Sequence, residues 1–146
     1  MDLNLPLYSA SLGAFLIALQ TILAAMVGGY RGRNRKAFGY DNDVVLERSV
    51  RRHANMAEYA PIFLIVLTLY ELLAGQTASV FWLGTLFAVG RVFHVIGFSS
   101  AAGSHLVEAK GARLLFVFSR MLGAGLTLVL SLALAVFLAW QVSTLS

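Results

Sequence analysis

The chain has 146 residues, of which 59% are hydrophobic and only 12% are charged, and its formal net charge is +4. Soluble domains carry about 25% charged residues, so a soluble domain of this length and composition is excluded. The absence of cysteine excludes a disulfide framework, a protein thiol nucleophile and cysteine-based metal sites. Any thiol chemistry therefore needs a thiol that arrives with a substrate.

The elements predicted along the chain are four apolar helices, at about residues 7–30, 44–74, 77–98 and 113–142. The first has 24 residues without a formal charge and no basic segment before it, which predicts a retained transmembrane helix rather than a signal peptide. A bilayer core of about 30 Å needs about 20 helical residues, so each segment can span it. The alternation typical of a barrel is absent. We expect an all-α membrane protein, a four-transmembrane-helix bundle, with residues 1–146 as a single domain.

The basic residues gather on one side of this predicted bundle. Ten of the eleven lysines and arginines flank the connections 31–43 and 99–112, and Arg91 is the exception. The N-terminal segment, the turn 74–79 and the C-terminal tail have none. The positive-inside rule then places both connections in the cytoplasm and both termini on the other side. This asymmetry explains the net charge better than nucleic-acid binding does, because no soluble basic domain is present.

The second helix begins with a polar stretch, ERSVRRHANMAEY, at residues 47–59. At 100° per residue, side chains at i, i+3, i+4 and i+7 share an arc of about 120°. The side chains in this arc are Arg48, Arg51, Arg52, Asn55, Glu58 and Tyr59. His53 points elsewhere, and Pro61 favours a bend just beyond. Arginines at a helix end can bind lipid phosphates, but polar groups two turns deeper usually face a polar cavity or each other.

The third and fourth helices add further charged side chains. Arg91 and His94 are spaced i, i+3. Arg91 lies about two turns from the cytoplasmic end, so it can extend to the interface, pair with Glu58 or Glu47, or contact a ligand. Arg120 lies seven residues beyond Arg113, which places it deeper in the membrane.

Other features of the helices predict packing rather than chemistry. Gly123 and Gly125 would let a neighbouring helix approach closely. Glu71, near the far end of the second helix, is expected to extend to the far interface. His53, His94 and His105 share no ligand spacing, so no metal site is expected.

Together these groups describe a pocket for a small, mainly anionic zwitterion. Guanidinium groups match carboxylates, a carboxylate matches an ammonium group, and the lipid side gives access to an apolar co-substrate. The sequence has no Ser–His–Asp set, P-loop or dinucleotide-binding fingerprint.

Residues 47–61, ERSVRRHANMAEYAP, resemble the second-helix signature of the MAPEG superfamily, the membrane-associated proteins in eicosanoid and glutathione metabolism. GRVFHVIGF at 90–98 and RMLGAGLT at 120–127 support the resemblance, and the variants HAN and EYAP are more similar to bacterial members. The resemblance implies a homotrimer of left-handed four-helix bundles in a bacterial inner membrane. It also implies that glutathione, as co-substrate, binds between adjacent subunits near the cytoplasmic face.

The resemblance also implies roles for single residues. Glutathione would be held by Arg31, Arg51, Asn55, Glu58, Tyr59, Arg91 and His94. Glu58 would bind the γ-glutamyl ammonium group, and Arg120 would be catalytic, because a nearby cation lowers the thiol pKa from about 8.5 and so stabilises the thiolate. The segment 99–119 is longer than in the mammalian synthases, which leaves Arg113 as an alternative to Arg120. Phe98 stands where several family synthases have a tyrosine.

The resulting hypothesis is a glutathione-dependent membrane transferase or peroxidase that acts on lipophilic electrophiles or lipid hydroperoxides. The alternative is a non-catalytic lipid-binding or scaffolding membrane protein on the same fold. An anion channel is disfavoured because the first and fourth helices lack formal charge over their outer halves.

Overall fold

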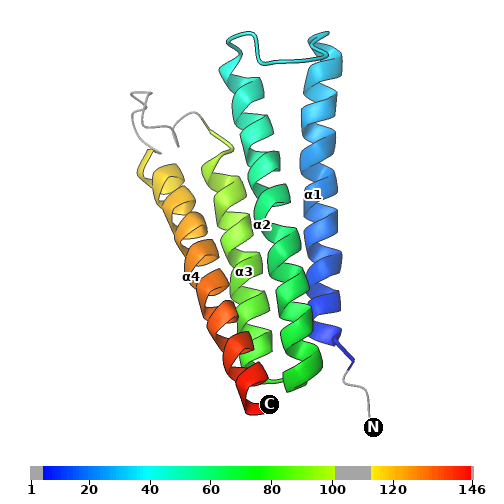
Figure 1. The fold of residues 1–146 in the computed structure, drawn as a ribbon. Helices are drawn as coiled ribbons and strands as arrows, with labels where there is room; N and C mark the ends of the chain where they lie inside the picture. The colour runs from blue at the N-terminus through cyan, green and yellow to red at the C-terminus, as the bar shows by residue number, and fades with distance from the viewer. Residues whose placement is uncertain (1–4, 101–112, 146) are drawn as a thin grey trace.

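The computed structural model describes residues 5–100 and 113–145, which form four helices and no strand. They are α1 (Leu7–Arg33), α2 (Val44–Ala74), α3 (Ala78–Gly97) and α4 (Arg113–Leu145). The helices lie side by side and run alternately up and down (Figure 1). Each is long and apolar enough to cross a membrane, so the predicted all-α, four-helix membrane fold is confirmed. Most of the predicted connection 99–112, with His105 and Lys110, lies outside the described residues.

The two ends of the bundle differ in what they contain. The α1–α2 loop, the end of α3 and the start of α4 lie at one end, which we call the loop end (Figure 1). The short α2–α3 turn, the start of α1 and the end of α4 lie at the other. Because a helix rises 1.5 Å per residue, α3 is about 30 Å long and α2 about 46 Å. The first turns of α2 therefore extend beyond a bilayer core of about 30 Å at the loop end.

Local sequence explains where α2 and α3 begin and end. The Asp43 carboxylate accepts hydrogen bonds from the N–H groups of Val45 and Leu46 and so caps α2. Gly75 follows the last turn of α2 with a φ of +77°, a conformation that favours glycine. The Thr77 hydroxyl then accepts from the N–H of Val80 at the start of α3. The polar stretch 47–58 is thus a continuous part of α2.

Apolar side chains fill the interior and also cover the outside of the bundle. The rings of Phe63 on α2 and Phe87 on α3 stack with centroids 3.7 Å apart, and Leu16 and Leu134 join the same core from α1 and α4. On the outer face of α4, Leu132 is 70% exposed. The other large exposed apolar side chains in the middle of α4 are Leu128, Val129, Val136 and Phe137. An apolar outer surface of this kind is stable in contact with lipid tails and not with water.

Glycines allow α3 and α4 to approach each other closely, and these two helices pack over a larger area than any other pair of the described helices. A Cβ atom on Gly123 would lie 2.5 Å from the His94 nitrogen and 2.6 Å from the Gly90 carbonyl oxygen. A Cβ atom on Gly97 would lie 2.6 Å from the backbone nitrogen of Arg120. A Cβ atom on Gly125 would meet nothing within 4 Å, so the predicted close contact at Gly125 is wrong within this subunit. Gly125 faces away because two residues advance a helix by about 200°.

Glu71 is completely buried, so the prediction that it extends to the membrane interface is wrong. Its Oε1 accepts from the Tyr8 N–H at 2.9 Å, and its Oε2 accepts from the Ser9 N–H at 2.7 Å and the Ser9 hydroxyl at 2.5 Å. The first N–H groups of a helix have no intrahelical partner and form the positive end of its dipole. The Glu71 carboxylate therefore fastens the start of α1 to the end of α2.

Candidate functional site

Arg91 on α3 is the centre of a polar cluster inside the loop-end half of the bundle. Its side chain is 1% exposed, and its Nη1 donates to Asn55 Oδ1 on α2 at 3.0 Å. Its Nη2 donates to the Gly123 carbonyl at 3.3 Å and to the Thr127 hydroxyl on α4, while Nε has no partner among the described residues. The alternative that Arg91 pairs with Glu58 or Glu47 is wrong within this subunit, because its hydrogen-bond acceptors are neutral groups.

A small hollow opens beside Arg91, with a volume of about 70 Å³. Its lining comes from α2, α3 and α4: Asn55, Tyr59, Arg91, His94, Ala124, Thr127 and Leu128. The Arg91 Cζ lies 5.9 Å from the Tyr59 ring centroid, within the range of a cation–π contact. A water molecule takes about 30 Å³ of the liquid, so the hollow admits one small group of a ligand rather than a whole peptide.

The other residues predicted on the same face of α2 point outward. Arg51 and Glu58 are exposed on the surface of the subunit, whereas Asn55 and Tyr59 are partly buried and line the hollow. The four side chains occupy adjacent positions around one helix face, so the exposed pair lies at the outer edge of the buried pair. The structure thus brings Asn55, Tyr59, Arg91 and His94 together and leaves Arg51 and Glu58 free to contact something outside the subunit.

Arg120 lies close to this cluster on α4. Its Cζ is 5.7 Å from the Phe98 ring centroid, and the same ring is 4.9 Å from the His94 ring. Arg113 is the first residue of α4, about 10 Å nearer the loop end, since seven residues separate the two arginines. Position therefore favours Arg120 over Arg113 as a neighbour of the hollow.

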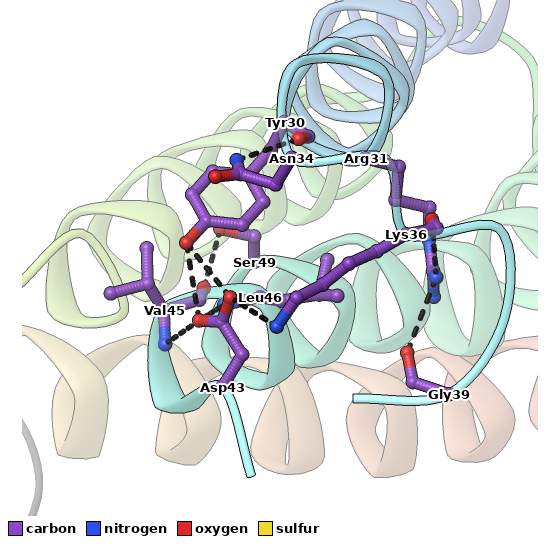
Figure 2. A network of polar contacts seen from close by, with 9 residues as sticks. All are labelled: Tyr30, Arg31, Asn34, Lys36, Gly39, Asp43, Val45, Leu46 and Ser49. Carbon is purple, nitrogen blue, oxygen red and sulfur yellow. Dashed lines mark hydrogen bonds and ion pairs between the residues drawn. The ribbon is translucent and has the colours of Figure 1, made fainter. Parts of the chain in front are cut away.

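Arg31 lies apart from the hollow and holds the α1–α2 loop. Its Nη1 donates to the carbonyl groups of Lys36 and Gly39 at 3.4 and 3.2 Å (Figure 2), and to that of Ala37 at 3.3 Å. Within one subunit Arg31 thus does not join Asn55 and Arg91.

Asp43 fixes the other side of the same loop. Its carboxylate accepts from the Tyr30 hydroxyl and from Lys36 Nζ, both at 2.9 Å (Figure 2). The Leu46 N–H, followed by Lys36, lowers the pKa of Asp43 from its ordinary value of 3.8 to about 2. The loop is therefore ordered by charge-assisted bonds at neutral pH.

Arg52 departs from the polar face on which the sequence placed it. It is 7% exposed, its Nη2 lies 3.4 Å from Met26 Sδ on α1, and its Nε has no partner among the described residues. The next residue, His53, also contacts α1, through Gln20 Nε2 at 2.9 Å. Arg52 lies at the edge of the predicted arc, where a long side chain can turn to either side. In this structure it turns toward α1.

An apolar groove of about 500 Å³ lies between α1 and α2. It is lined by Gly13, Leu16, Ile17, Gln20, Met56, Ala57, Ala60, Pro61 and Leu64. Gln20 is the one polar side chain in this set, so the groove suits a hydrocarbon chain. It lies on the face of α2 opposite to the hollow, since Met56 and Ala60 face α1 while Asn55 and Tyr59 face α3 and α4.

Sequence reasoning did not assign a role to Thr127, although its hydroxyl contacts Arg91 and lines the hollow. A signal was present, because Arg120, Gly123 and Thr127 recur at i, i+3 and i+7 and so share one face of α4. Within residues 5–100 and 113–145, no three His, Asp or Glu side chains gather in a way that could hold a metal ion.

The model of the MAPEG family matches residues 9–141, which is nearly the whole chain. None of the curated protein sequences matches this chain. The family consists of four-helix membrane bundles with glutathione-related transferase and peroxidase roles in general. Four membrane-spanning helices, the polar stretch at the start of α2 and the match over residues 9–141 agree: the chain is an integral, multi-pass membrane protein that belongs to the MAPEG family.

Proposed function

We propose that the protein is a glutathione-dependent membrane transferase or peroxidase that acts on lipophilic electrophiles or lipid hydroperoxides. The observation that carries the proposal is the hollow beside Arg91, in which side chains from α2, α3 and α4 converge. One small group of glutathione would enter the hollow, and the rest of the tripeptide would extend over the exposed Arg51 and Glu58. Guanidinium groups then bind the glutathione carboxylates, and Glu58 binds the γ-glutamyl ammonium group.

The position of the polar residues supports an assembly in which the site is completed by a second subunit. Arg51 and Glu58 are exposed charged side chains at the edge of the hollow, and Glu58 lies deeper along α2, where an ionisable group is costly in contact with lipid alone. A homotrimer places a neighbouring subunit over them and gives glutathione a pocket with two walls. Arg31, which holds its own loop, would reach glutathione only across such an interface. The loop end faces the cytoplasm in this proposal, in a bacterial inner membrane, as the basic residues favour.

Transfer begins with deprotonation of the glutathione thiol. Arg120 stabilises the thiolate by its charge, which lowers the thiol pKa from about 8.5 and raises the reactive fraction at neutral pH. The thiolate sulfur then attacks an electrophilic carbon of the lipophilic substrate. A C–S bond forms, and the electron pair leaves with the displaced group or, in an addition, is protonated from water.

In a peroxidase reaction the same thiolate attacks the terminal oxygen of a lipid hydroperoxide. The O–O bond breaks, the sulfur becomes a sulfenic acid, and the alkoxide takes a proton to give the lipid alcohol. A second glutathione condenses with the sulfenic acid, which gives glutathione disulfide and water. Both reactions need a polar site that opens to the lipid, and the hollow lies inside the membrane-spanning region.

The test of the proposal is glutathione binding to the purified protein in detergent, measured by calorimetry. Arg51→Gln removes a charge-assisted bond, so we expect binding at least tenfold weaker. Arg33→Gln is the matched control, because Arg33 is exposed at the end of α1 and outside the site, and we expect it to bind as the unchanged protein does. No measurable glutathione binding by the unchanged protein, or equal losses in the two variants, would contradict the proposal.

The apolar groove between α1 and α2 favours the second candidate, a lipid-binding or scaffolding protein without chemistry. A volume of about 500 Å³ lined almost entirely by apolar side chains can hold part of a lipid chain. Glutathione binding without a thiolate absorbance and without conjugation of a model electrophile would support this candidate over the enzyme.

A further inference from the structure

The loop between α1 and α2, residues 34–43, forms an open hollow of about 370 Å³ with the end of α1. Its lining residues are Arg31, Gly32, Arg35, Lys36 and Ala37. Three of these five described residues are cations, and none of the five is acidic. Such a concave, positively charged surface attracts an anion of the size of a phosphate group.

The hollow is held in shape from two sides. Arg31 donates to three carbonyl groups of the loop, those of Lys36, Ala37 and Gly39. Asp43 binds both Tyr30 and Lys36 (Figure 2). Lys36 has three donor hydrogens, so its bond to Asp43 leaves others for a ligand. A site fixed in advance loses little conformational entropy when it binds.

The side chain of Arg35, unlike those of Arg31 and Lys36, makes no contact with the described residues in this hollow that would give it a structural role. Its φ is +53°, in the left-handed region that side chains other than glycine rarely adopt. Its guanidinium has no hydrogen-bond or ion-pair partner among the described residues. Strained conformations of this kind persist where the surroundings enforce them, and they concentrate at ligand-binding sites.

The exposed Phe38 indicates that the anion belongs to the lipid headgroup region. It lies two residues beyond Lys36 and is 88% exposed, and Val44, one residue after the loop, is 60% exposed. Phe, Trp and Leu beside basic residues are the side chains that interfacial segments insert at the boundary between lipid headgroups and acyl chains. Apolar side chains next to a cluster of cations match the order of groups in a lipid, where a phosphate is attached to hydrocarbon.

We propose that the α1–α2 loop is a preformed binding site for the phosphate of an anionic lipid in the adjacent leaflet. Arg35 and Lys36 contact the phosphate, and Phe38 enters the headgroup region beside it. The end of α1 and the loop together carry four basic residues between Arg31 and Lys36, against Asp41 and Asp43, so a bound phosphate balances the excess of positive charge. This site is separate from the hollow beside Arg91, and the inference does not depend on glutathione chemistry.

The experiment uses the full-length protein in nanodiscs of phosphatidylcholine with or without phosphatidylglycerol. Retention of phosphatidylglycerol is measured by native mass spectrometry, and the thermal midpoint is measured in the same samples. A single basic side chain near an anionic surface changes binding by about fivefold. We expect Arg35→Gln to lower retention at least fivefold and to remove most of the rise in thermal midpoint that phosphatidylglycerol gives the unchanged protein.

Arg33→Gln is the matched control, because Arg33 carries the same charge in the same segment but does not line the hollow. We expect less than a twofold change for this variant. Equal losses for Arg33→Gln and Arg35→Gln would show a diffuse charge effect and overturn the proposal. Phe38→Ser, which leaves the charges in place, is expected to lower retention as well, and an unchanged value would contradict the role of the headgroup region.

A separate arm distinguishes a lipid from a soluble anion. Inorganic phosphate is added to the protein in phosphatidylcholine nanodiscs, and we expect no rise in thermal midpoint, because Phe38 gains no contact. A rise equal to that given by phosphatidylglycerol, lost in Arg35→Gln, would assign the hollow to a soluble phosphate and overturn the lipid proposal.

Discussion

Glu71 and Arg91 are both buried in the bundle with no oppositely charged partner among the described residues, and they differ in how many of their polar atoms are hydrogen-bonded. Glu71 accepts three hydrogen bonds from the start of α1, so both of its oxygens are bonded. Arg91 donates to three neutral oxygens, but its Nε has no partner among the described residues and a hollow lies beside it. Glu71 therefore has a structural role, because it links the end of α2 to the start of α1. Arg91 still has a donor that can bind a ligand.

This difference shows that burial of a charge does not by itself mark a functional site in a membrane protein. A charge whose neighbours use all its bonding groups stabilises the fold, and its removal leaves those neighbours unpaired. A charge with unused donors beside open space can bind something new. The first three predictions test the two halves of this comparison, and the fourth extends it to a carboxylate at the surface.

The largest effect on stability is expected for Glu71→Gln. The amide keeps one acceptor but turns a second group into a donor that faces the N–H of Ser9, so we expect a loss of about 2–3 kcal/mol. Chemical unfolding in detergent measures it. Glu58→Gln is the matched control, because Glu58 lies exposed on the same helix, and we expect almost no loss of stability there. Similar losses of stability in the two variants would show that the bonds from Glu71 to the start of α1 do not stabilise the fold.

The next largest loss of stability is expected where α3 packs against α4, because this contact positions Arg91 beside its acceptors on α4. We expect Gly123→Ala to lose about 1–3 kcal/mol, because the new methyl group would meet the His94 and Gly90 backbone. Gly125→Ala adds the same methyl group to open space and should be neutral or slightly stabilising. Thermal unfolding of both variants side by side checks this, and a Gly125→Ala loss as large as that of Gly123→Ala would contradict it.

Arg91→Met should separate binding from stability. Removal of Arg91 leaves the Asn55 side-chain oxygen without its donor, whereas the Gly123 carbonyl keeps the Thr127 hydroxyl. We therefore expect a loss of stability smaller than that of Glu71→Gln. Glutathione binding, in contrast, should weaken at least tenfold, since a cation next to the hollow is lost. Calorimetric titration and unfolding of the same preparation measure both. A loss of stability as large as that of Glu71→Gln, with unchanged binding, would reverse the roles of the two residues.

The smallest effect is expected for Asp43, a carboxylate near the surface rather than inside the bundle. Because its pKa in the folded protein is lowered to about 2, its contribution is complete above about pH 4 and is lost as the pH falls toward 2. Protection of the Val45 and Leu46 N–H groups from hydrogen exchange should therefore decrease over this range. Asp43→Asn should show weaker protection at neutral pH and no further decrease, and a decrease identical to that of the unchanged protein would assign it to another group.

Sequence reasoning predicted the helices because hydropathy and helix ends are local properties. The convergence of Asn55 and Tyr59 on one face of α2 follows from helical periodicity. The hydrogen bonds between Glu71 and Ser9 could not be predicted. These residues are 62 positions apart in the chain, and their contact depends on how α1 packs beside α2.

The site was predicted less completely than the fold for the same reason. Periodicity places Arg91 on a face of α3 but does not say whether Glu58, Glu47 or Asn55 is opposite. It also cannot show that Arg31 turns back to bind carbonyl groups of its own loop, since that depends on positive φ angles at Arg35 and Gly39. Long arginine side chains reach several partners, and only the packed structure selects among them.

The most direct test of the central proposal is the ultraviolet absorbance of the glutathione thiolate on the purified protein, followed by stopped flow at neutral pH. The unchanged protein should give a thiolate signal, Arg113→Met should keep it, and Arg120→Met should lose it at least tenfold because the stabilising charge is removed. A signal that persists in Arg120→Met, or that is absent from the unchanged protein, would contradict glutathione activation at this site.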